Sequence, residues 1–299
     1  MNNINNRFSI KDLENLTGIK AHTIRIWEKR YNLLTPKRTD TNIRYYDLAN
    51  FQKLLNVSYL NSNGYKISKI ATLDEHRIPV LVREIAAQNN IESHAVNSFK
   101  LSMLNFDQVL FYNTYEALLR ERSFSQIFTE VFIPLLTEIG LLWQTNTITP
   151  AHEHFITTFI RQKILINTEK IQAKKAHSSK RTYVLYLPDS EIHELGLLFI
   201  NYMVVQSGYH SIFLGQSVPI ESLKDLINYY DDLVFISYFT IQPDKESING
   251  YVREFNKEIL ENNAAEFWIL GRMLNSLNID ILPNQIKTFN SIESLVDRL

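Results

Sequence analysis

The sequence contains no cysteine, and this absence excludes several kinds of chemistry. Without thiols the 299-residue chain has no disulfides, no thiolate metal ligands and no cysteine nucleophile. Glycine and proline are scarce, with 8 of each, which excludes collagen-like and low-complexity structure. The lack of cysteine fits a reducing compartment, and the cytoplasm is the expected location.

Long apolar runs and leader-like segments are also missing. No apolar run approaches the ~18 residues that a membrane span requires. The first six residues, MNNINN, have neither the basic start nor the apolar core of a secretory signal. We therefore expect no membrane partner, and the apolar content of 45% is that of an ordinary globular protein.

The charge is unevenly distributed along the chain. Residues 1–70 carry twelve basic and five acidic side chains, a balance of +7. Because the whole chain has a net charge of −1, the remainder carries −8. A basic segment joined to an acidic body predicts a polyanionic partner for that segment alone.

Hydrophobic spacing predicts three parts. Residues 1–75 show short helices and a short strand around residues 43–46, with a polar loop expected over residues 36–42. Residues 76–177 repeat apolar side chains every three to four positions, which is typical of a four-helix-type bundle. Residues 178–299 alternate strands and helices, which predicts a Rossmann-like parallel sheet. The expected fold class is therefore multidomain, α and α/β.

The expected elements of the last part are specific enough to test. Strands are predicted at residues 183–187, 211–214, 233–238, 267–270 and 286–289, and helices at 193–206, 221–230 and 291–299. In such sheets ligands bind at the carboxyl ends of the strands.

The basic first part has the pattern of a helix-turn-helix. A short helix and Gly18 precede a second helix over residues 21–31, which carries Arg25, Lys29 and Arg30. Such a unit lays its second helix in the major groove of DNA, and here the exposed face would present His22, Thr23 and Arg25. The alternative is a small helical domain with a solvated basic surface.

The order of motifs favours DNA binding. The stretches Phe8-Ser9-Ile10-Lys11, Leu16-Thr17-Gly18-Ile19, Thr23-Ile24-Arg25-Ile26-Trp27-Glu28 and Asn42-Ile43-Arg44-Tyr45-Tyr46 resemble the MerR family of regulators, which have a winged helix-turn-helix head. The resemblance implies that double-stranded operator DNA is the partner and that Trp27 lies in the core. The residues implied to touch DNA are Thr23, Arg25, Tyr31, Arg38, Arg44 and Tyr45.

Two further motifs lie in the body of the chain. The first lies at the junction between the first predicted strand of the last part and the helix that follows it, and reads Glu191-Ile192-His193-Glu194-Leu195-Gly196. A histidine there can present a ring nitrogen to a metal while a carboxylate fixes its tautomer, although an isolated histidine at such a place is more often structural. Trp143 is followed after nine residues by Glu153-His154, with Pro150 between them; a core tryptophan and a solvated helix start are the alternative.

Together these motifs resemble cobalamin-binding modules. Glu191-x-His193-x-x-Gly196 matches their Asp/Glu-x-His-x-x-Gly pattern, and Gly215-x-x-Val218-Pro219 matches the segment after the second strand. Ser237-Tyr238-Phe239 falls at their Ser-x-Leu position, and Trp143-x9-Glu153-His154 matches the helical cap motif of the light-sensing CarH/LitR repressor family.

The resemblance implies a ligand and a mechanism. His193 would be the lower axial ligand of cobalt in adenosylcobalamin, whose nucleotide tail would lie near Ser237 and Gly271. Trp143, Glu153 and His154 would surround the upper adenosyl group. Loss of that group in light would change the oligomeric state, dimer or tetramer, and release DNA.

Two positions depart from the family pattern. The expected Gly-Gly is Leu270-Gly271-Arg272, and Gln144 follows Trp143 where a histidine is expected. A regulator of the same architecture that responds to another chromophore, ligand or protein therefore stays an alternative. A cobalamin-dependent enzyme is disfavoured because the chain has no room for a substrate barrel of ~200 residues. A purely structural scaffold would not explain the charge asymmetry.

Overall fold

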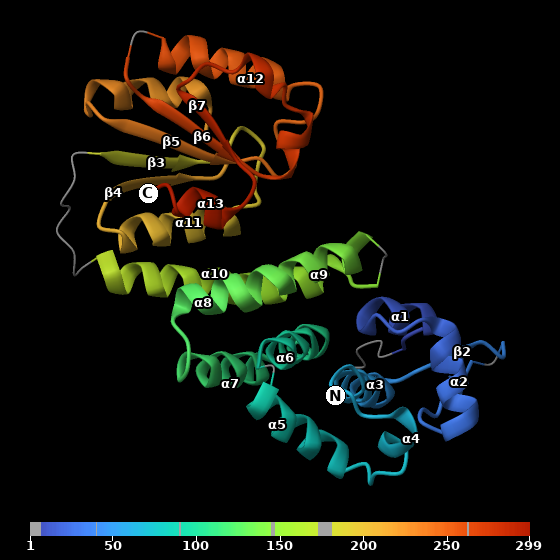
Figure 1. Cartoon of the computed structure of the whole chain (residues 1–299). Coiled ribbons are helices and arrows are strands. Elements are labelled where there is room, and N and C mark those ends of the chain that lie inside the picture. The colour runs from blue at the N-terminus through green and yellow to red at the C-terminus, as the bar shows by residue number, and fades with distance from the viewer. Residues whose placement is uncertain (1–6, 40, 90, 145–146, 173–180, 262) are drawn as a thin grey trace. The chain divides into compact units, whose positions relative to one another are not determined.

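The computed structural model describes residues 7–39, 41–89, 91–144, 147–172, 181–261 and 263–299, without the side chains of residues 83, 84, 86–89, 91–93, 143, 144 and 280. These residues form two compact units, 1–157 and 158–299 (Figure 1). The boundaries predicted near residues 75 and 177 stay predictions, and the expected linker at residues 174–180 lies outside the described residues.

The first unit begins with four helices and a small hairpin. These are α1 (Ile10–Thr17), α2 (Ala21–Tyr31), β1 (Lys37–Arg38), β2 (Arg44–Tyr45), α3 (Leu48–Ser62) and α4 (Ile67–Ile70). Ser9 begins α1 through a capping box with Asp12, and Gly18 ends it at a φ of 74°, a left-handed conformation that suits glycine. Trp27 is buried, as predicted.

The hairpin corrects one expectation. The polar stretch over residues 36–42 was expected to be a loop, but its first part pairs with the next segment as an antiparallel ribbon. Lys37 lies opposite Tyr45 and Arg38 opposite Arg44. Arg38 also donates to the carbonyl oxygen and the side-chain oxygen of Asn42, at 3.2 and 2.7 Å, which closes the turn. Polar composition hid the strand because both of its residues are exposed cations.

A helical bundle completes the first unit and continues to residue 172. Its elements are α5 (Arg77–Asn89), α6 (Ile91–Asn105), α7 (Gln108–Leu119), α8 (Phe124–Ile127), the π-helical turn η1 (Phe128–Phe132), α9 (Ile133–Gln144) and α10 (Pro150–Gln172). Buried aromatic rings hold it together: Phe99 packs 5.0 Å from Phe111 and 5.4 Å from Phe132, measured between centroids. Helix α10 begins at Pro150, whose ring suits the first position of a helix.

One helix in the bundle corrects the expectation about apolar runs. The stretch Phe124–Leu142 has 19 residues and a mean hydropathy of 1.3, which is long and apolar enough to cross a membrane by length and composition. In the structure most of its apolar side chains, among them Val131 and Leu135, are buried in the bundle, while Leu141 near its end is 59% exposed. Its two acids pair with cations, Glu138 with Lys100 and Glu130 with Arg122. This packing is that of a core helix in a globular domain.

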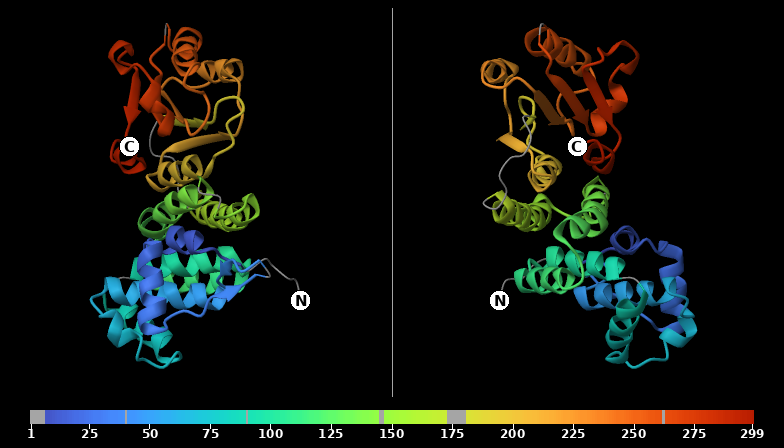
Figure 2. Two further views of the ribbon diagram at one scale, coloured as in Figure 1. Left: turned by 90° about the vertical axis from the view of Figure 1, so that its right-hand side faces the viewer. Right: turned by 60° about the vertical axis from the view of Figure 1, so that its left-hand side comes forward.

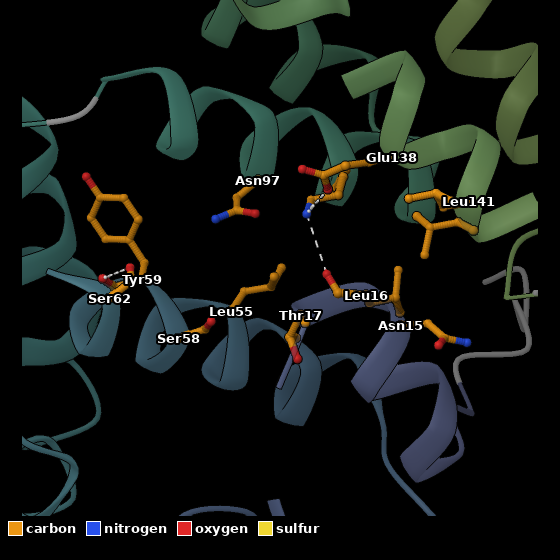
Figure 3. A pocket seen from close by; sticks show the side chains of 13 residues that line it. Asn15, Leu16, Thr17, Leu55, Ser58, Tyr59, Ser62, Asn97, Glu138 and Leu141 are labelled. Atoms are coloured by element: carbon orange, nitrogen blue, oxygen red, sulfur yellow. Dashed lines mark hydrogen bonds and ion pairs between the residues drawn. The ribbon is translucent and has the colours of Figure 1, made fainter. Parts of the chain in front are cut away.

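A cavity of about 320 Å³ separates α1 and α3 from α6 and α9 (Figure 3). Lys100 lies at its wall with only 6% of its side chain exposed, and its Nζ is 2.6 Å from Glu138. The same ammonium is 3.5 Å from the carbonyl oxygen of Leu16, in the last turn of α1. One buried cation therefore contacts both α1 and the bundle.

The second unit is built on a five-stranded parallel sheet in the order β4-β3-β5-β6-β7. Its strands are β3 (Thr182–Tyr186), β4 (His210–Gly215), β5 (Leu233–Tyr238), β6 (Glu266–Leu270) and β7 (Ile286–Phe289). The helices are α11 (Leu195–Gln206), α12 (Ile248–Phe255), α13 (Ile292–Val296), the 3₁₀ helices η2 (Ile220–Asn228), η4 (Arg272–Ser276) and η5 (Ile279–Ile281), and the π-helical turn η3 (Asn256–Leu260).

The doubly wound arrangement confirms the predicted fold class. All five strands lie where they were predicted, and α11 and α13 cover one face of the sheet while α12 covers the other (Figures 1 and 2). Two expectations were wrong in detail. The segment predicted as a helix over residues 221–230 is the 3₁₀ helix η2, and α12 was not predicted.

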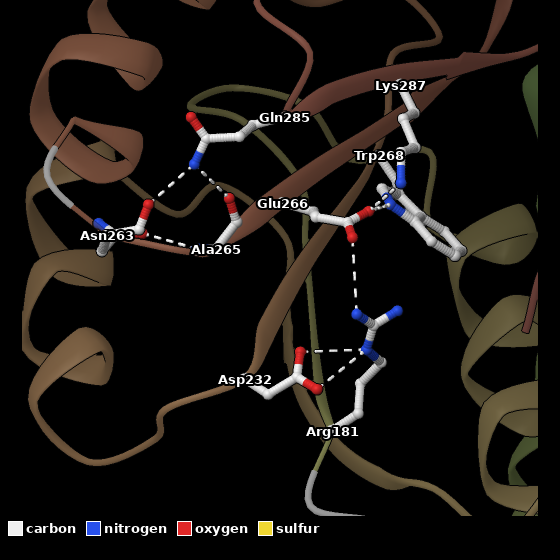
Figure 4. Close-up of polar contacts among 8 residues, drawn as sticks. All are labelled: Arg181, Asp232, Asn263, Ala265, Glu266, Trp268, Gln285 and Lys287. Atoms are coloured by element: carbon white, nitrogen blue, oxygen red, sulfur yellow. Dashed lines mark hydrogen bonds and ion pairs between the residues drawn. The ribbon is translucent and has the colours of Figure 1, made fainter.

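Polar contacts fix the amino ends of the strands (Figure 4). Arg181 donates to Asp232 at 3.0 Å and lies 3.5 Å from Glu266. Glu266 also accepts from the Trp268 ring nitrogen at 2.7 Å and pairs with Lys287 at 2.5 Å. Burial alone would raise the pKa of Glu266, but these donors lower it. The network joins the starts of β3, β5, β6 and β7.

Candidate functional site

The second helix of the head presents a cationic face. His22, Arg25, Lys29 and Arg30 are all exposed on α2, whereas Ile24 and Trp27 are buried on its other side. The exposed set follows helical spacing and so forms one face, as a major-groove helix requires. Thr23 and Tyr31 are half-buried, and the Oγ1 of Thr23 lies 3.3 Å from Nε2 of His22.

Glu28 links this helix to the hairpin. Its carboxylate pairs with Arg44 at 3.2 Å and accepts a short hydrogen bond from the Tyr46 hydroxyl. Only 9% of the Glu28 side chain is exposed, while 45% of Arg44 is. Arg44 therefore has an anchor inside the head and an exposed portion on the hairpin. The spacing argument did not single out Glu28 or Tyr46, because their roles depend on contacts between segments eighteen residues apart.

The hairpin exposes further cations. Arg38 and Arg44 are exposed on opposite strands, and Tyr45 is half-buried beneath the guanidinium of Arg7, 4.9 Å from the ring centroid. Arg7 was not among the predicted DNA contacts. Sequence spacing could not identify Arg7 as a candidate, because only the fold shows that it lies beside Tyr45, a predicted DNA contact.

The loop after β3 is organised around one buried carboxylate. Glu191 is fully buried, and one of its oxygens accepts from the backbone N–H groups of Ile192 and His193 at 2.9 and 3.0 Å. The other accepts from the backbone of Ile241 and Gln242 at 2.7 and 2.8 Å. This capture of backbone donors explains why α11 begins at Leu195 rather than at residue 193 as predicted.

Glu191 also orients the histidine. Nδ1 of His193 lies 2.6 Å from the carboxylate, and 41% of the His193 side chain is exposed. With the proton on Nδ1, the lone pair of the ring is on Nε2, the nitrogen that metal-ligating histidines offer when a carboxylate holds the other one. Burial by itself would raise the pKa of Glu191, but the His193 hydrogen bond and the backbone donors lower it to about 2. The carboxylate thus stays charged at neutral pH.

Glu194, the residue after His193, forms an ion pair with helix α10. Glu194 is buried and its Oε1 lies 2.5 Å from Nε of Arg161, in the part of α10 that belongs to the second unit. Since Glu194 immediately follows His193, this ion pair adds a second constraint on the loop.

Apolar side chains surround this loop at the carboxyl edge of the sheet. Ile192 is 62% exposed and Ile241 46%, and both are joined to Glu191 by backbone hydrogen bonds. Leu214, at the end of β4, is 39% exposed. Exposed apolar side chains beside an oriented histidine fit a flat hydrophobic ligand with a metal at its centre, and this part of the site fits a corrinoid.

Two glycines of the predicted cofactor-binding set are closely packed. A Cβ on Gly196 would lie only 2.6 Å from Cε2 of Tyr238, so the tyrosine ring rests directly on this glycine. Gly271, at a φ of 117°, packs against the backbone of Phe239, where a Cβ would lie 2.7 Å from the carbonyl carbon. Ser237 is buried and donates to the Tyr186 carbonyl at 2.9 Å.

The remaining predicted residues are placed in separate parts of the chain. The half-buried Val218 donates its N–H to the Leu187 carbonyl at 2.9 Å, which positions it at the same sheet edge as His193. Glu153 and His154 lie in the first turns of α10, within the first unit. The Trp143 side chain lies outside the described residues. The meeting of this cap set with His193 stays a prediction.

Two protein families match the chain in the order of its parts. The family described as MerR HTH family regulatory protein matches residues 8–76, the segment with α1, α2 and the hairpin. The family described as B12 binding domain matches residues 95–166, within the helical bundle. The matches support DNA binding by the head and cobalamin binding by the body.

Individual proteins share both parts. The chain is 30% identical over 215 residues to the HTH-type transcriptional repressor CarH of Myxococcus xanthus, covering 70% of each chain. It is 23% identical over 241 residues to the repressor CarA of the same organism, covering 79% of this chain and 78% of that one. These relatives are transcriptional regulators, not enzymes.

A solved structure supports the fold of the body. The monomethylamine corrinoid protein of Methanosarcina barkeri superposes with a TM-score of 0.57 at 11% identity, over 69% of this chain and 97% of that one. At that identity the likeness shows the fold alone. The sequence match to CarH covers 70% of the chain, and the chain belongs to the CarH-type family of MerR transcriptional repressors, in which a helix-turn-helix head is joined to a B12-binding domain.

Proposed function

We propose that this repressor binds adenosylcobalamin through His193 and that the bound cofactor and light control its oligomeric state and its hold on DNA. The observation that carries the proposal is the His193–Glu191 pair, in which a fully buried carboxylate fixes the tautomer of a half-exposed imidazole at the carboxyl edge of a parallel sheet. When bound, adenosylcobalamin supplies a cobalt–carbon bond that light can break.

Other residues of the chain orient His193 and are proposed to surround the cofactor. Glu191 holds the proton of His193 on Nδ1, and Ile192, Leu214 and Ile241 offer apolar surface beside it. Arg161 holds the loop through Glu194. Glu153, His154 and Trp143 are proposed to face the upper side of the cofactor, and Val218, Ser237 and Gly271 its lower side.

DNA binding is assigned to the helix-turn-helix head. Thr23, Arg25 and His22 on α2 are proposed to contact bases or phosphates of the operator, and Arg38, Arg44 and Tyr45 the adjacent backbone, with Tyr31 at the end of the helix. A symmetric operator requires at least a dimer. A ligand changes such an equilibrium only by binding the two states with different affinities. Since DNA is the target, we expect the protein in the cytoplasm.

The central experiment is reconstitution with adenosylcobalamin in the dark, followed by desalting and an absorbance spectrum. Retention of the corrinoid with a spectrum that shows displacement of its own benzimidazole supports the proposal. His193→Ala is expected to lose this spectrum or to weaken binding at least tenfold. Complete loss of corrinoid from the wild-type protein on desalting contradicts the cofactor assignment.

The DNA half of the proposal is tested separately. Arg25→Ala is expected to abolish sequence-specific retardation of operator DNA while leaving corrinoid retention as in the wild type. Comparison of retardation and sedimentation in the dark and after illumination then tests the coupling. Identical DNA binding and oligomeric state in both conditions, with the corrinoid bound, would remove light from the proposal.

A further inference from the structure

Tyr238 occupies the space beside the histidine loop. It is the last residue of β5, and its ring lies on Gly196, with three ring carbons between 2.6 and 3.1 Å from the position of a Cβ. Gly196 follows His193 by three residues, in the first turn of α11. The ring therefore fills the gap between α11 and the sheet, next to the segment that presents the imidazole.

The neighbouring strand closes the same region. Leu270 pairs with Tyr238 in register at the end of β6 and is buried. Gly271 follows it and is packed against the Phe239 backbone, whose carbonyl oxygen also accepts from the Met273 N–H at 3.1 Å. This backbone contact is fixed by the strand pairing, so of the two closures only the Tyr238 side chain can be removed by rotation or substitution.

The chemistry of cobalamin makes this region decisive. In free cobalamin the benzimidazole at the end of the nucleotide tail is itself the lower ligand of cobalt. When a protein histidine takes that coordination position, the tail is displaced, yet it remains covalently attached on the side from which the histidine approaches. A tail displaced by His193 must then enter the protein beside His193, where the Tyr238 ring lies.

We propose that Tyr238 is a specificity-determining residue that narrows the tail side of the site, so that the protein binds corrinoids without a nucleotide tail more tightly than it binds cobalamin. The inference rests on the proposed function, because it assumes that His193 ligates a corrinoid. The surface proposed to bind the corrin ring is not affected by Tyr238, because Ile192 and Ile241 remain exposed beside His193.

The test compares two corrinoids that differ in the tail. Diaquacobinamide, which lacks the nucleotide, and aquacobalamin, which carries it, are titrated into the full-length protein in the dark, and bound corrinoid is measured by equilibrium dialysis and absorbance. The wild-type protein is expected to bind the cobinamide at least tenfold more tightly than the cobalamin. This comparison needs no variant and so does not depend on the folding of one.

Variants then assign the selectivity to the ring. Tyr238→Ala is expected to raise cobalamin affinity at least tenfold and to change cobinamide affinity less than threefold. Tyr238→Phe keeps the ring and is expected to behave like the wild type, which separates ring volume from the hydroxyl. Tyr238→Val is the second opening variant, with a β-branched side chain suited to a strand.

The outcomes separate the two proposals. Wild-type preference for cobalamin, or no gain in cobalamin affinity in folded Tyr238→Ala and Tyr238→Val, overturns the role of Tyr238 and leaves corrinoid binding intact. Failure of the wild type and both opening variants to retain either corrinoid, with circular dichroism spectra of folded protein, overturns the proposed function and the inference that rests on it.

Discussion

At the scale of single residues, Glu191 carries the largest number of constraints in the candidate ligand site. Its two oxygens accept from four backbone N–H groups and from the His193 ring. A buried acceptor with this many donors stabilises the loop and the imidazole orientation together. Its replacement should therefore affect stability and ligand binding at once.

Glu191→Gln tests this double role. In the wild type, backbone N–H groups donate to both carboxylate oxygens of Glu191. In the variant the amide NH₂ replaces one of these oxygens, so that two donors face each other. A buried donor left without an acceptor costs roughly 1–3 kcal/mol. Urea unfolding should show a loss of about 2 kcal/mol. As a control, Glu221→Gln, whose side chain is 88% exposed, should change stability by less than about 0.5 kcal/mol. Equal stability of the two variants would contradict the assigned role.

The pH dependence of the same group has a defined sign. The folded-state pKa of Glu191 is about 2, below its ordinary value of 4.5. Its stabilising contribution is therefore fully present above about pH 4.5 and is lost as the pH falls towards 2, for a total of about 3 kcal/mol. Unfolding measured at pH 7, 4 and 3 should show the wild type and Glu191→Gln converging as the pH falls. A constant difference would contradict the assignment.

At the scale of elements, the recognition helix and the hairpin act as one piece because Glu28 joins them. Its carboxylate holds both Arg44 and the Tyr46 hydroxyl. The pKa of Tyr46 is raised, first by burial and then by its hydrogen bond to Glu28, so the phenol stays protonated and donates.

Glu28→Ala should release the hairpin from α2. We expect operator affinity, measured by fluorescence anisotropy, to fall several-fold even though a negative charge has been removed from a DNA-binding surface. That direction is informative, because removal of an acid with no structural role would raise the affinity for a polyanion. Glu75→Ala, whose side chain is 75% exposed, is the comparison for a general charge effect, and a rise in affinity for both variants would refute the anchoring role.

Lys100 contributes to the contact between the head and the bundle. Lys100→Met keeps the length of the side chain but removes the ammonium that contacts Glu138 and the Leu16 carbonyl. Because Glu138 is 44% exposed and can turn to water, we expect a loss of about 1–2 kcal/mol rather than the larger cost of a fully buried pair. Thermal unfolding measures it, with the exposed Lys170→Met as control. A stability equal to that of the control would show that the contact is not stabilising.

Sequence reasoning succeeded for elements with strong local signals. The three central strands of the sheet, β3, β5 and β6, are largely buried runs rich in β-branched and aromatic side chains, and Gly18 and Pro150 mark a helix end and a helix start. It failed where tertiary contacts decide. Lys37 and Arg38 form a strand only because β2 pairs with them, and α11 starts late because Glu191 captures backbone donors. Tyr238 was read as one position in a motif, while its contact with Gly196 required the fold.

At the scale of the whole molecule, the separation of charge governs the response to salt. The basic head carries +7 over residues 1–70 and the rest of the chain −8. Cations bound to phosphates release counterions from DNA, so affinity falls steeply with ionic strength. A dimer with six or more phosphate contacts should lose about 10³-fold in operator affinity between 50 and 200 mM salt.

Corrinoid binding at the proposed His193 site is the control for this prediction. Ligand contacts at the carboxyl edge are mainly apolar, so corrinoid binding should change little over the same salt range. Operator affinity is measured by anisotropy and corrinoid retention by dialysis, on one preparation. A shallow salt dependence of DNA binding would argue that few of the exposed cations on α2 and the hairpin reach phosphates.

The polar network of Arg181, Asp232, Glu266 and Lys287 has a consequence for how such a regulator can change over evolution. It secures four strands at their amino ends, whereas the His193 loop and Tyr238 lie at their carboxyl ends. Substitutions at the carboxyl edge can then alter which molecule is sensed without loss of the sheet. The same DNA-binding head can be inherited unchanged, so one lineage can acquire a new input for an old set of genes through a few side chains.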